Sequence, residues 1–167
     1  VGSEMCIRDS ESTDIQVTDC HVTINCQDGD IVGCVWLGSC KDSLCANNTV
    51  LGETTDGFLE AVGIRVNREH DNTNPRDSCN NLVIGNSVTT IKHGIMLEET
   101  SDDDIVYNTL ADCTNGIVFP SYGNPAAANP TVVLNSLRNV AHPFREFVTP
   151  DGLTQYFNDD VFMSYFP

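Results

Sequence analysis

Basic side chains gather in one stretch of an otherwise acidic chain. The chain has 24 Asp and Glu against eight Lys and Arg, which gives a formal net charge of −16. A guanidinium binds a carboxylate or a sulfate, including those of sugars, through paired hydrogen bonds. We therefore predict that the basic residues of this stretch form a site for an acidic sugar ligand. The candidate catalytic residues are Arg65, Arg68, His70, Lys92 and His93, and the candidate substrate-binding residues are Arg76 and Asn67.

The same residues have structural alternatives. Glu99 falls one repeat after Arg68, so these two side chains could form a surface ion pair, which is common and weakly stabilising. His93, Asn115 and His142 fall in one column of the repeat described below. Lining a turn is a simpler role for that column than catalysis or metal binding.

An acidic run, EETSDDD, puts five carboxylates in seven residues. Calcium prefers several hard oxygen ligands at about 2.3–2.6 Å, so calcium is the candidate cofactor. The spacing differs from that of an EF-hand loop, and a solvated acidic turn is the alternative. The candidate metal ligands are Glu98, Glu99, Asp102, Asp103 and Asp104.

A third candidate is the carboxylate pair Asp28 and Asp30 in the stretch CQDGD. Hydrolysis of a glycosidic bond uses two carboxyl groups about 5–9.5 Å apart. Two Asp residues separated by Gly are equally typical of a plain turn.

Bulk composition restricts the partners and the compartment. The negative charge repels nucleic acid and anionic membranes, and no stretch approaches the roughly 18 apolar residues of a membrane span. Of the eight cysteines, seven follow Cys6, which favours an extracellular or secreted location. The chain contains no CxxC pair, so a zinc ribbon is not expected. Cys40 with Cys45, or Cys45 with Cys79, are candidate disulfides.

The first ten residues, VGSEMCIRDS, are predicted to be non-native. The DNA that would encode them resembles the end of a transposase-type sequencing adapter, so we expect the natural N-terminus to be missing. Residues 11–147 are expected to form one repeat domain. Residues 148–167 are expected to cover its last repeat or to lead into a further region.

The candidate residues lie between copies of one repeat. Residues 83–97 align with residues 105–119 without a gap, and the first half recurs from Val132. The template is apolar-x-x-Asn-x-apolar, followed by Gly-Ile-x-Leu. Each half has the spacing of a short strand with a bend. A two-strand unit of about 22 residues buries its apolar side only by stacking on copies of itself.

Stacking in register at about 4.8 Å places equivalent side chains in columns. Asn86, Asn108 and Asn135 form one column, in which amides hydrogen-bond in a ladder and Asn adopts the left-handed bend. Asp19 and Glu53 are expected at the same place in the outer repeats. The predicted core columns are Val50/Val83/Ile105/Val132, Val88/Leu110/Leu137, Ile64/Ile95/Ile117 and Val66/Leu97/Phe119.

The repeat also makes predictions for a glycine column, for Cys113 and for the segments between repeats. Gly63, Gly94 and Gly116 are expected to supply a second bend before the following strand. Cys113 falls in an otherwise aliphatic inward column, which predicts a buried thiol. The segments after the second strand differ in length and are expected to frame a groove at one edge. These segments are 38–48, 67–81, 98–104 and 120–131.

The repeat resembles the right-handed parallel β-helix of the pectin-lyase-like superfamily, over about five rungs. The fold class is therefore all-β, a parallel β-helix solenoid. The resemblance implies an extracellular carbohydrate-active protein that binds an acidic polysaccharide and, as a lyase or hydrolase, would cleave it. A non-catalytic stalk, adhesin or tailspike-like segment is the alternative, in which Arg65→Ala and His93→Ala leave ligand binding unchanged.

Overall fold

The computed structural model describes residues 7–10, 12–24, 31–52, 60–68, 78–120, 127–146 and 154–156. Within these ranges the regular structure is all β-strand, and no helix is long and apolar enough to cross a membrane. Several predicted residues fall outside the described ranges. They are Asp28, Asp30, Glu53, His70 and Arg76.

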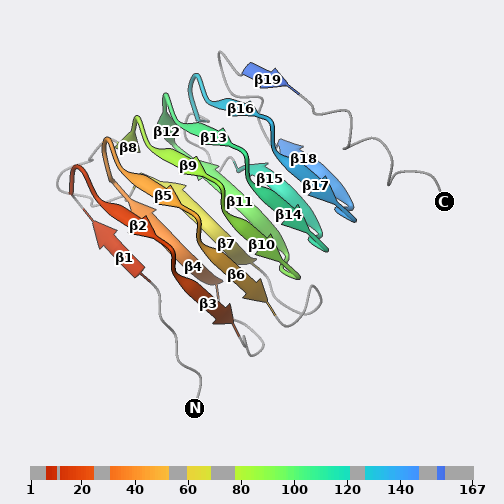
Figure 1. Cartoon of the computed structure of the whole chain (residues 1–167). Helices are drawn as coiled ribbons and strands as arrows, with labels where there is room; N and C mark the ends of the chain where they lie inside the picture. The colour runs from red at the N-terminus through yellow and green to blue at the C-terminus, as the bar shows by residue number, and fades with distance from the viewer. Residues whose placement is uncertain are drawn as a thin grey trace.

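Three parallel sheets run along the coil, and each takes one strand from every rung (Figure 1). Sheet I contains β1 (Ile7–Ser10), β4 (Ile31–Gly38), β7 (Glu60–Asn67), β11 (His93–Glu98), β15 (Asn115–Phe119) and β18 (His142–Glu146). Sheet II contains β2 (Gln16–Thr18), β5 (Leu44–Ala46), β9 (Leu82–Ile84), β13 (Asp104–Val106), β16 (Thr131–Val133) and β19 (Thr154–Tyr156). Sheet III contains β3 (His21–Ile24), β6 (Thr49–Gly52), β10 (Ser87–Thr89), β14 (Thr109–Ala111) and β17 (Ser136–Arg138). A short ladder of β8 (Ser78–Cys79) and β12 (Thr100–Ser101) lies at the corner between sheets I and II.

The predicted parallel β-helix is confirmed. The described residues contain five complete rungs, from β2–β3–β4 to β16–β17–β18. The backbone of residues 7–10 pairs with β4, so part of the segment predicted to be non-native adds a strand of sheet I one rung before β4. Its origin stays a prediction. At the other end β19 pairs with β16 and extends sheet II into the segment predicted to cover the last rung.

Each rung has three strands, whereas the repeat suggested two. The first half of the template splits at its Asn, so that β9 and β10 lie on either side of Asn86 and belong to different sheets. The turn is short because the residue before the Asn adopts a left-handed backbone. Tyr107 and Leu134 show this with φ angles of 55° and 56°, and Gly85 with 68°. The left-handed residue was therefore misplaced by one position.

The predicted core columns are confirmed except at Val50. Val83 pairs with Ile105 in sheet II, and both side chains are 0 % exposed. Val50 instead pairs with Val88 in sheet III, and Cys45 pairs with Val83. The error arose because Cys45 occupies the first apolar position of that rung. The stretch from Cys45 to Val50 fits the same template once a thiol counts as apolar.

The asparagine ladder is confirmed and is longer than predicted. The side-chain amide of Asn86 donates to Asn108 Oδ1 at 2.9 Å, and that of Asn108 donates to Asn135 Oδ1 at 3.0 Å. Asn48 adds one step by donating to Asn86 Oδ1 at 3.0 Å. The ladder ends where the backbone N–H of Cys20 donates to Asn48 Oδ1. Asp19 is therefore wrong as a ladder position, since it lies at the preceding turn residue.

The glycines that recur in the repeat serve close packing and do not supply bends. A Cβ on Gly94 would lie 2.7 Å from the carbonyl oxygen of Gly116 and 3.1 Å from Leu110 Cδ1. A Cβ on Gly116 would lie 2.5 Å from Leu137 Cδ2. Neither glycine has a positive φ, so the predicted second bend is wrong at these positions. The glycines let sheet III side chains pack directly against sheet I.

The ladder predicts a large stability cost for Asn108→Ala. The substitution leaves the Asn86 N–H and the Val83 carbonyl without the partners that Asn108 supplies. Two buried orphan groups cost about 2–4 kcal/mol of unfolding free energy. Urea unfolding followed by circular dichroism measures this cost. Thr109→Ala, at an exposed neighbouring position, is the control and should change stability by less than about 0.5 kcal/mol. Equal effects of the two substitutions would contradict the role of the ladder.

Candidate functional site on the outer face of sheet I

The outer face of sheet I carries a file of large side chains, one from each rung. Trp36 pairs with Arg65, Arg65 with Met96, and Met96 with Val118. The file ends at Arg145, which pairs with Val118. Residues on either side of the file fill the core, so these side chains point away from it. In-register stacking therefore brings Trp36 and Arg65 together although they are far apart in sequence.

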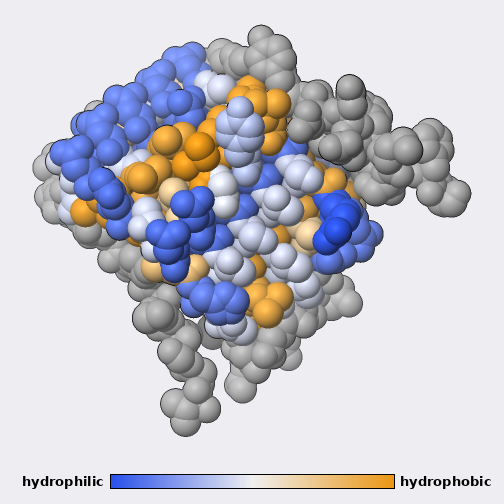
Figure 2. All heavy atoms as spheres, viewed as in Figure 1, coloured by the Kyte–Doolittle hydropathy of each residue, from blue (hydrophilic) through white to orange (hydrophobic). Residues whose placement is uncertain are grey.

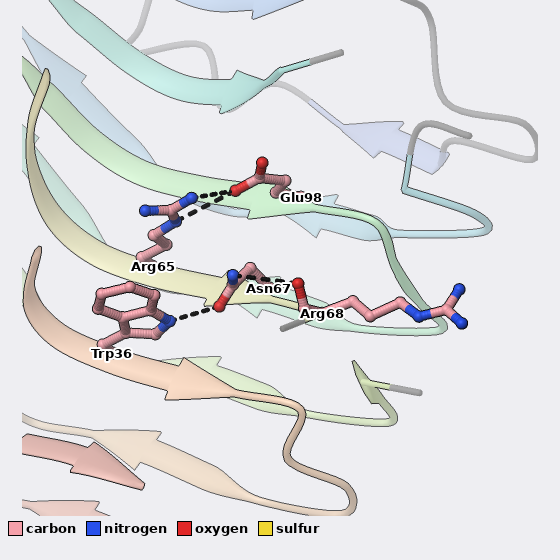
Figure 3. Close-up of polar contacts among 5 residues, drawn as sticks. All are labelled: Trp36, Arg65, Asn67, Arg68 and Glu98. Carbon is pink, nitrogen blue, oxygen red and sulfur yellow. Dashed lines mark hydrogen bonds and ion pairs between the residues drawn. The ribbon is translucent and has the colours of Figure 1, made fainter. Parts of the chain in front are cut away.

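Arg65 is held from two sides (Figure 3). Its guanidinium carbon lies 4.8 Å from the centroid of the Trp36 ring, within the range of a cation–π contact. Its Nε donates to Glu98 Oε2 at 3.1 Å, and its Nη2 donates to the same oxygen. The two side chains are only 14 % and 10 % exposed. This ion pair is largely out of water, and its charges neutralise one another.

Asn67 connects Trp36 to the end of β7. The Trp36 indole N–H donates to Asn67 Oδ1, and the Asn67 amide donates to the carbonyl oxygen of Arg68 at 3.2 Å. The backbone N–H of Arg68 donates in turn to the carbonyl oxygen of Glu98 at 3.1 Å. Asn67 is 5 % exposed and Trp36 is half-buried. The backbone of Arg68 is therefore fixed at the edge of the sheet.

The Arg68 guanidinium is a cation without a counter-ion among the described residues. Its Nε is buried and has no hydrogen-bond partner. The side chain extends away from the cluster of Trp36, Arg65 and Glu98 (Figure 3). The predicted alternative, an ion pair with Glu99, is not formed within the described ranges. The ion pair present here joins Arg65 and Glu98.

Lys92 and His93 lie at the opposite end of β11 from Glu98. His93 pairs with Val62 and Asn115, which confirms its predicted column with Asn115 and His142. The Asn115 amide donates to His93 Nδ1 at 2.9 Å, so a neutral His93 carries its proton on Nε2. The predicted catalytic set is therefore divided. Arg65 and Arg68 lie near one end of sheet I, and Lys92 and His93 lie near the other.

The acidic run does not converge on one point. Glu98 faces outward beside Arg65, whereas the Asp103 side chain is 1 % exposed and lies inside the corner. Asp104 is exposed, and Asp102 is exposed and accepts from the Asn129 amide at 3.1 Å. Within the described ranges no three His, Cys, Asp or Glu side chains are grouped so as to hold a metal ion.

Asp103 belongs to a second ladder of polar side chains. Its Oδ1 accepts from the backbone N–H of Asn81 at 2.8 Å and from the Asn81 amide at 3.0 Å. Its Oδ2 contacts Thr100 Oγ1, which also lies 2.9 Å from the Ser78 carbonyl oxygen. A hydroxyl has one proton and a carbonyl only accepts, so both contacts are satisfied when Asp103 is protonated and donates to Thr100.

Electrostatics favour protonation of Asp103 below about pH 6. Burial raises the pKa of Asp103 from 3.8 to about 6, although hydrogen bonds from Thr100 and Asn81 favour the charged form. The neighbouring carboxylate of Asp102 raises the pKa further. Asp103 therefore occupies the place of an Asn amide in its ladder.

The predicted disulfides are wrong, and the predicted buried thiol is confirmed. Cys45 is a free thiol inside the asparagine ladder, where it accepts from the Asn48 amide at 3.3 Å. Burial raises the pKa of Cys45 to about 12. Cys113 is 3 % exposed, and burial raises the pKa of its thiol to about 11. Cys45 fills a core position, so its sulfur points away from the surface segments where pairing was expected.

The stacked parallel sheets place the chain in the class of β-helix solenoids of the pectin-lyase-like superfamily. A family model described as "Periplasmic copper-binding protein (NosD)" matches residues 3–159, and the chain belongs to this family. The periplasm in that description agrees with the predicted location outside the cytoplasm at a coarse level. No curated protein and no solved structure matches the chain significantly.

The described residues do not fit a copper site. Proteins bind copper through Cys, Met and His ligands. His93 Nδ1 is engaged by Asn115, and the Cys45 and Cys113 thiols point into the coil. Met96 lies in the outward file between Arg65 and Val118. No grouped ligand set accompanies these residues in the described ranges.

The raised pKa of Asp103 predicts that this residue contributes less to stability at neutral pH than at acidic pH. The folded state binds the Asp103 proton more tightly than the unfolded state does. The contribution of Asp103 to the free energy of unfolding is therefore fully present below pH 3.8 and is lost as pH rises through about 6. The loss approaches about 3 kcal/mol by pH 7.5. Asp103→Asn should abolish this dependence and raise the urea midpoint at pH 7.5.

Asp104→Asn is the matched control, because Asp104 is an exposed neighbour. It should leave the difference between the urea midpoints at pH 5 and pH 7.5 unchanged. An Asp103→Asn variant that is less stable than the parent at pH 7.5 would show that the carboxylate is the preferred form.

Proposed function

We propose that this β-helix binds an acidic oligosaccharide or polysaccharide at the edge of sheet I, beside Arg68. The observation that carries the proposal is the Arg68 guanidinium, which has a buried Nε without a partner and no counter-ion among the described residues. A guanidinium in this position is a donor for the carboxylate of a uronic acid. Its backbone is fixed by Asn67 and Glu98, so binding has to order only the Arg68 side chain.

The neighbouring residues support binding in different ways. Trp36 is half-buried and offers part of an aromatic surface on which a sugar ring can stack. Arg65 is already neutralised by Glu98, so its role is to hold Trp36 and Glu98 in place. Arg76 and His70 precede β8 in the segment that follows Arg68, and they remain candidates for further contacts.

The proposal is binding without cleavage. Lyase chemistry needs a base close to the cation that binds the sugar carboxylate. Among the described candidates, Lys92 and His93 lie at the far end of β11 from Arg68. Calcium remains a candidate bridge between the ligand and exposed carboxylates such as Asp102. Copper, which the family description names, finds no grouped ligand set among the described residues and is therefore tested separately.

Titration calorimetry with oligogalacturonate and oligomannuronate should detect binding, while a neutral cello-oligosaccharide should not bind. Work at about 0.15 M salt shortens the Debye length to about 8 Å, which screens the distant carboxylates of this acidic protein. Arg68→Ala should weaken binding at least about tenfold, as expected for loss of a charge-assisted bond. Arg68→Lys should retain part of it.

Arg138→Ala is the matched control, because Arg138 is an exposed arginine on sheet III. It should leave the affinity unchanged. Parallel titrations with added calcium, with Cu(I) and with Cu(II) separate the metal alternatives. Equal affinities of the Arg68→Ala variant and the parent would remove this site, and a rise in ultraviolet absorbance from unsaturated sugar ends would show cleavage.

A further inference from the structure

The outer face of sheet II carries an apolar band. Val83 and Ile105 point into the core, so the residues beside them point outward. Ile84 pairs with Val106, and Val106 with Val133, which forms an outward aliphatic file along the coil. All three are only partly buried. The file continues at Ala46, and Tyr107 and Leu134 border it with 59 % and 37 % exposure.

A hydrophilic row runs beside this band. Figure 2 shows the two side by side, with the hydrophilic row along the corner that precedes sheet II. Asp42 accepts from the Asn80 amide at 3.2 Å, and Asp102 accepts from the Asn129 amide at 3.1 Å, so the row is ordered by its own ladder. Asp104 adds a carboxylate between the row and the band.

The charge of the surface indicates which kind of partner fits. An exposed apolar band rimmed by polar groups is typical of a protein interaction site. A second copy of this chain would bring carboxylate rows together on a protein with a net charge of −16, which opposes association. A partner with aliphatic residues facing the band and Lys or Arg facing the row is complementary to both.

The backbone of the sheet indicates the shape of the partner. The N–H and C=O groups of β9, β13 and β16 are used within sheet II, so its outer face offers no backbone hydrogen bonds. A lone extended segment on the band would bury its own backbone groups without partners. A helix satisfies them internally, and its turns of about 5.4 Å follow rungs spaced by about 4.8 Å.

We propose that the outer face of sheet II docks an amphipathic helix of another protein. The aliphatic side of that helix packs on Ile84, Val106 and Val133. Lys or Arg residues along one flank of the helix face the carboxylates of Asp42 and Asp102. The proposal is independent of sugar binding, because it concerns a different sheet from the one that carries Arg68.

The probe is a synthetic helical peptide of about 15 residues, which spans four rungs at about 1.5 Å per residue. It carries Leu on one side and Lys along one flank, and a second peptide has Glu in place of Lys. Fluorescence anisotropy should show saturable binding of the Lys peptide only, weakened by salt. The double variant Ile84→Lys/Val106→Lys should bind at least about tenfold more weakly.

Leu51→Lys is the matched control, since Leu51 is exposed on sheet III, and it should bind as the parent does. Ile84→Thr/Val106→Thr keeps β-branched side chains and serves as a second test if the Lys variant unfolds. Equal binding by the parent and the double variants would overturn the proposal. So would equal binding of the Glu peptide, or self-association in analytical ultracentrifugation that the double variants abolish.

Discussion

In-register stacking of successive rungs is the constraint on which the rest of the structure depends. Each strand pairs with its equivalent one rung away, so residues that share a place in the repeat share a file in space. The asparagine ladder enforces this register at the turn, because Asn86 supplies both its side-chain amide and its backbone N–H to Asn108 Oδ1. A slip by one residue would break both bonds and turn the core side chains outward.

The same register explains why the candidate site lies at an edge. Val62, Met96 and Val118 form a second apolar cluster outside the coil, and they are 1 %, 2 % and 0 % exposed. The middle of sheet I is therefore buried on both faces, as parallel sheets commonly are. Polar groups there must be paired, and Arg65 is paired with Glu98. A cation can remain without a counter-ion only where water reaches it, which is at the end of β7.

The repeat predicted most of the core and less of the site. Equivalent apolar residues such as Ile95 and Ile117 repeat visibly, because burial selects them by type. Cys45 was missed because its template position held a thiol in place of an aliphatic side chain. The contact between Trp36 and Arg65 needs the exact register of β4 and β7, whose connecting segments differ in length from those of other rungs. Spacing alone cannot supply that register.

The carboxyl groups of the acidic run have different structural roles. Calcium binding requires ionised oxygens that share one cavity. Asp103 instead points into the corner, where burial raises its pKa to about 6 although Thr100 and Asn81 hydrogen-bond to it. A buried carboxyl that is engaged in a structural ladder is a poor cation ligand, whereas Asp102 and Asp104 stay exposed. The run is thus divided. Asp103 replaces an amide, Glu98 pairs with Arg65 on sheet I, and Asp102 and Asp104 make the rim of sheet II acidic.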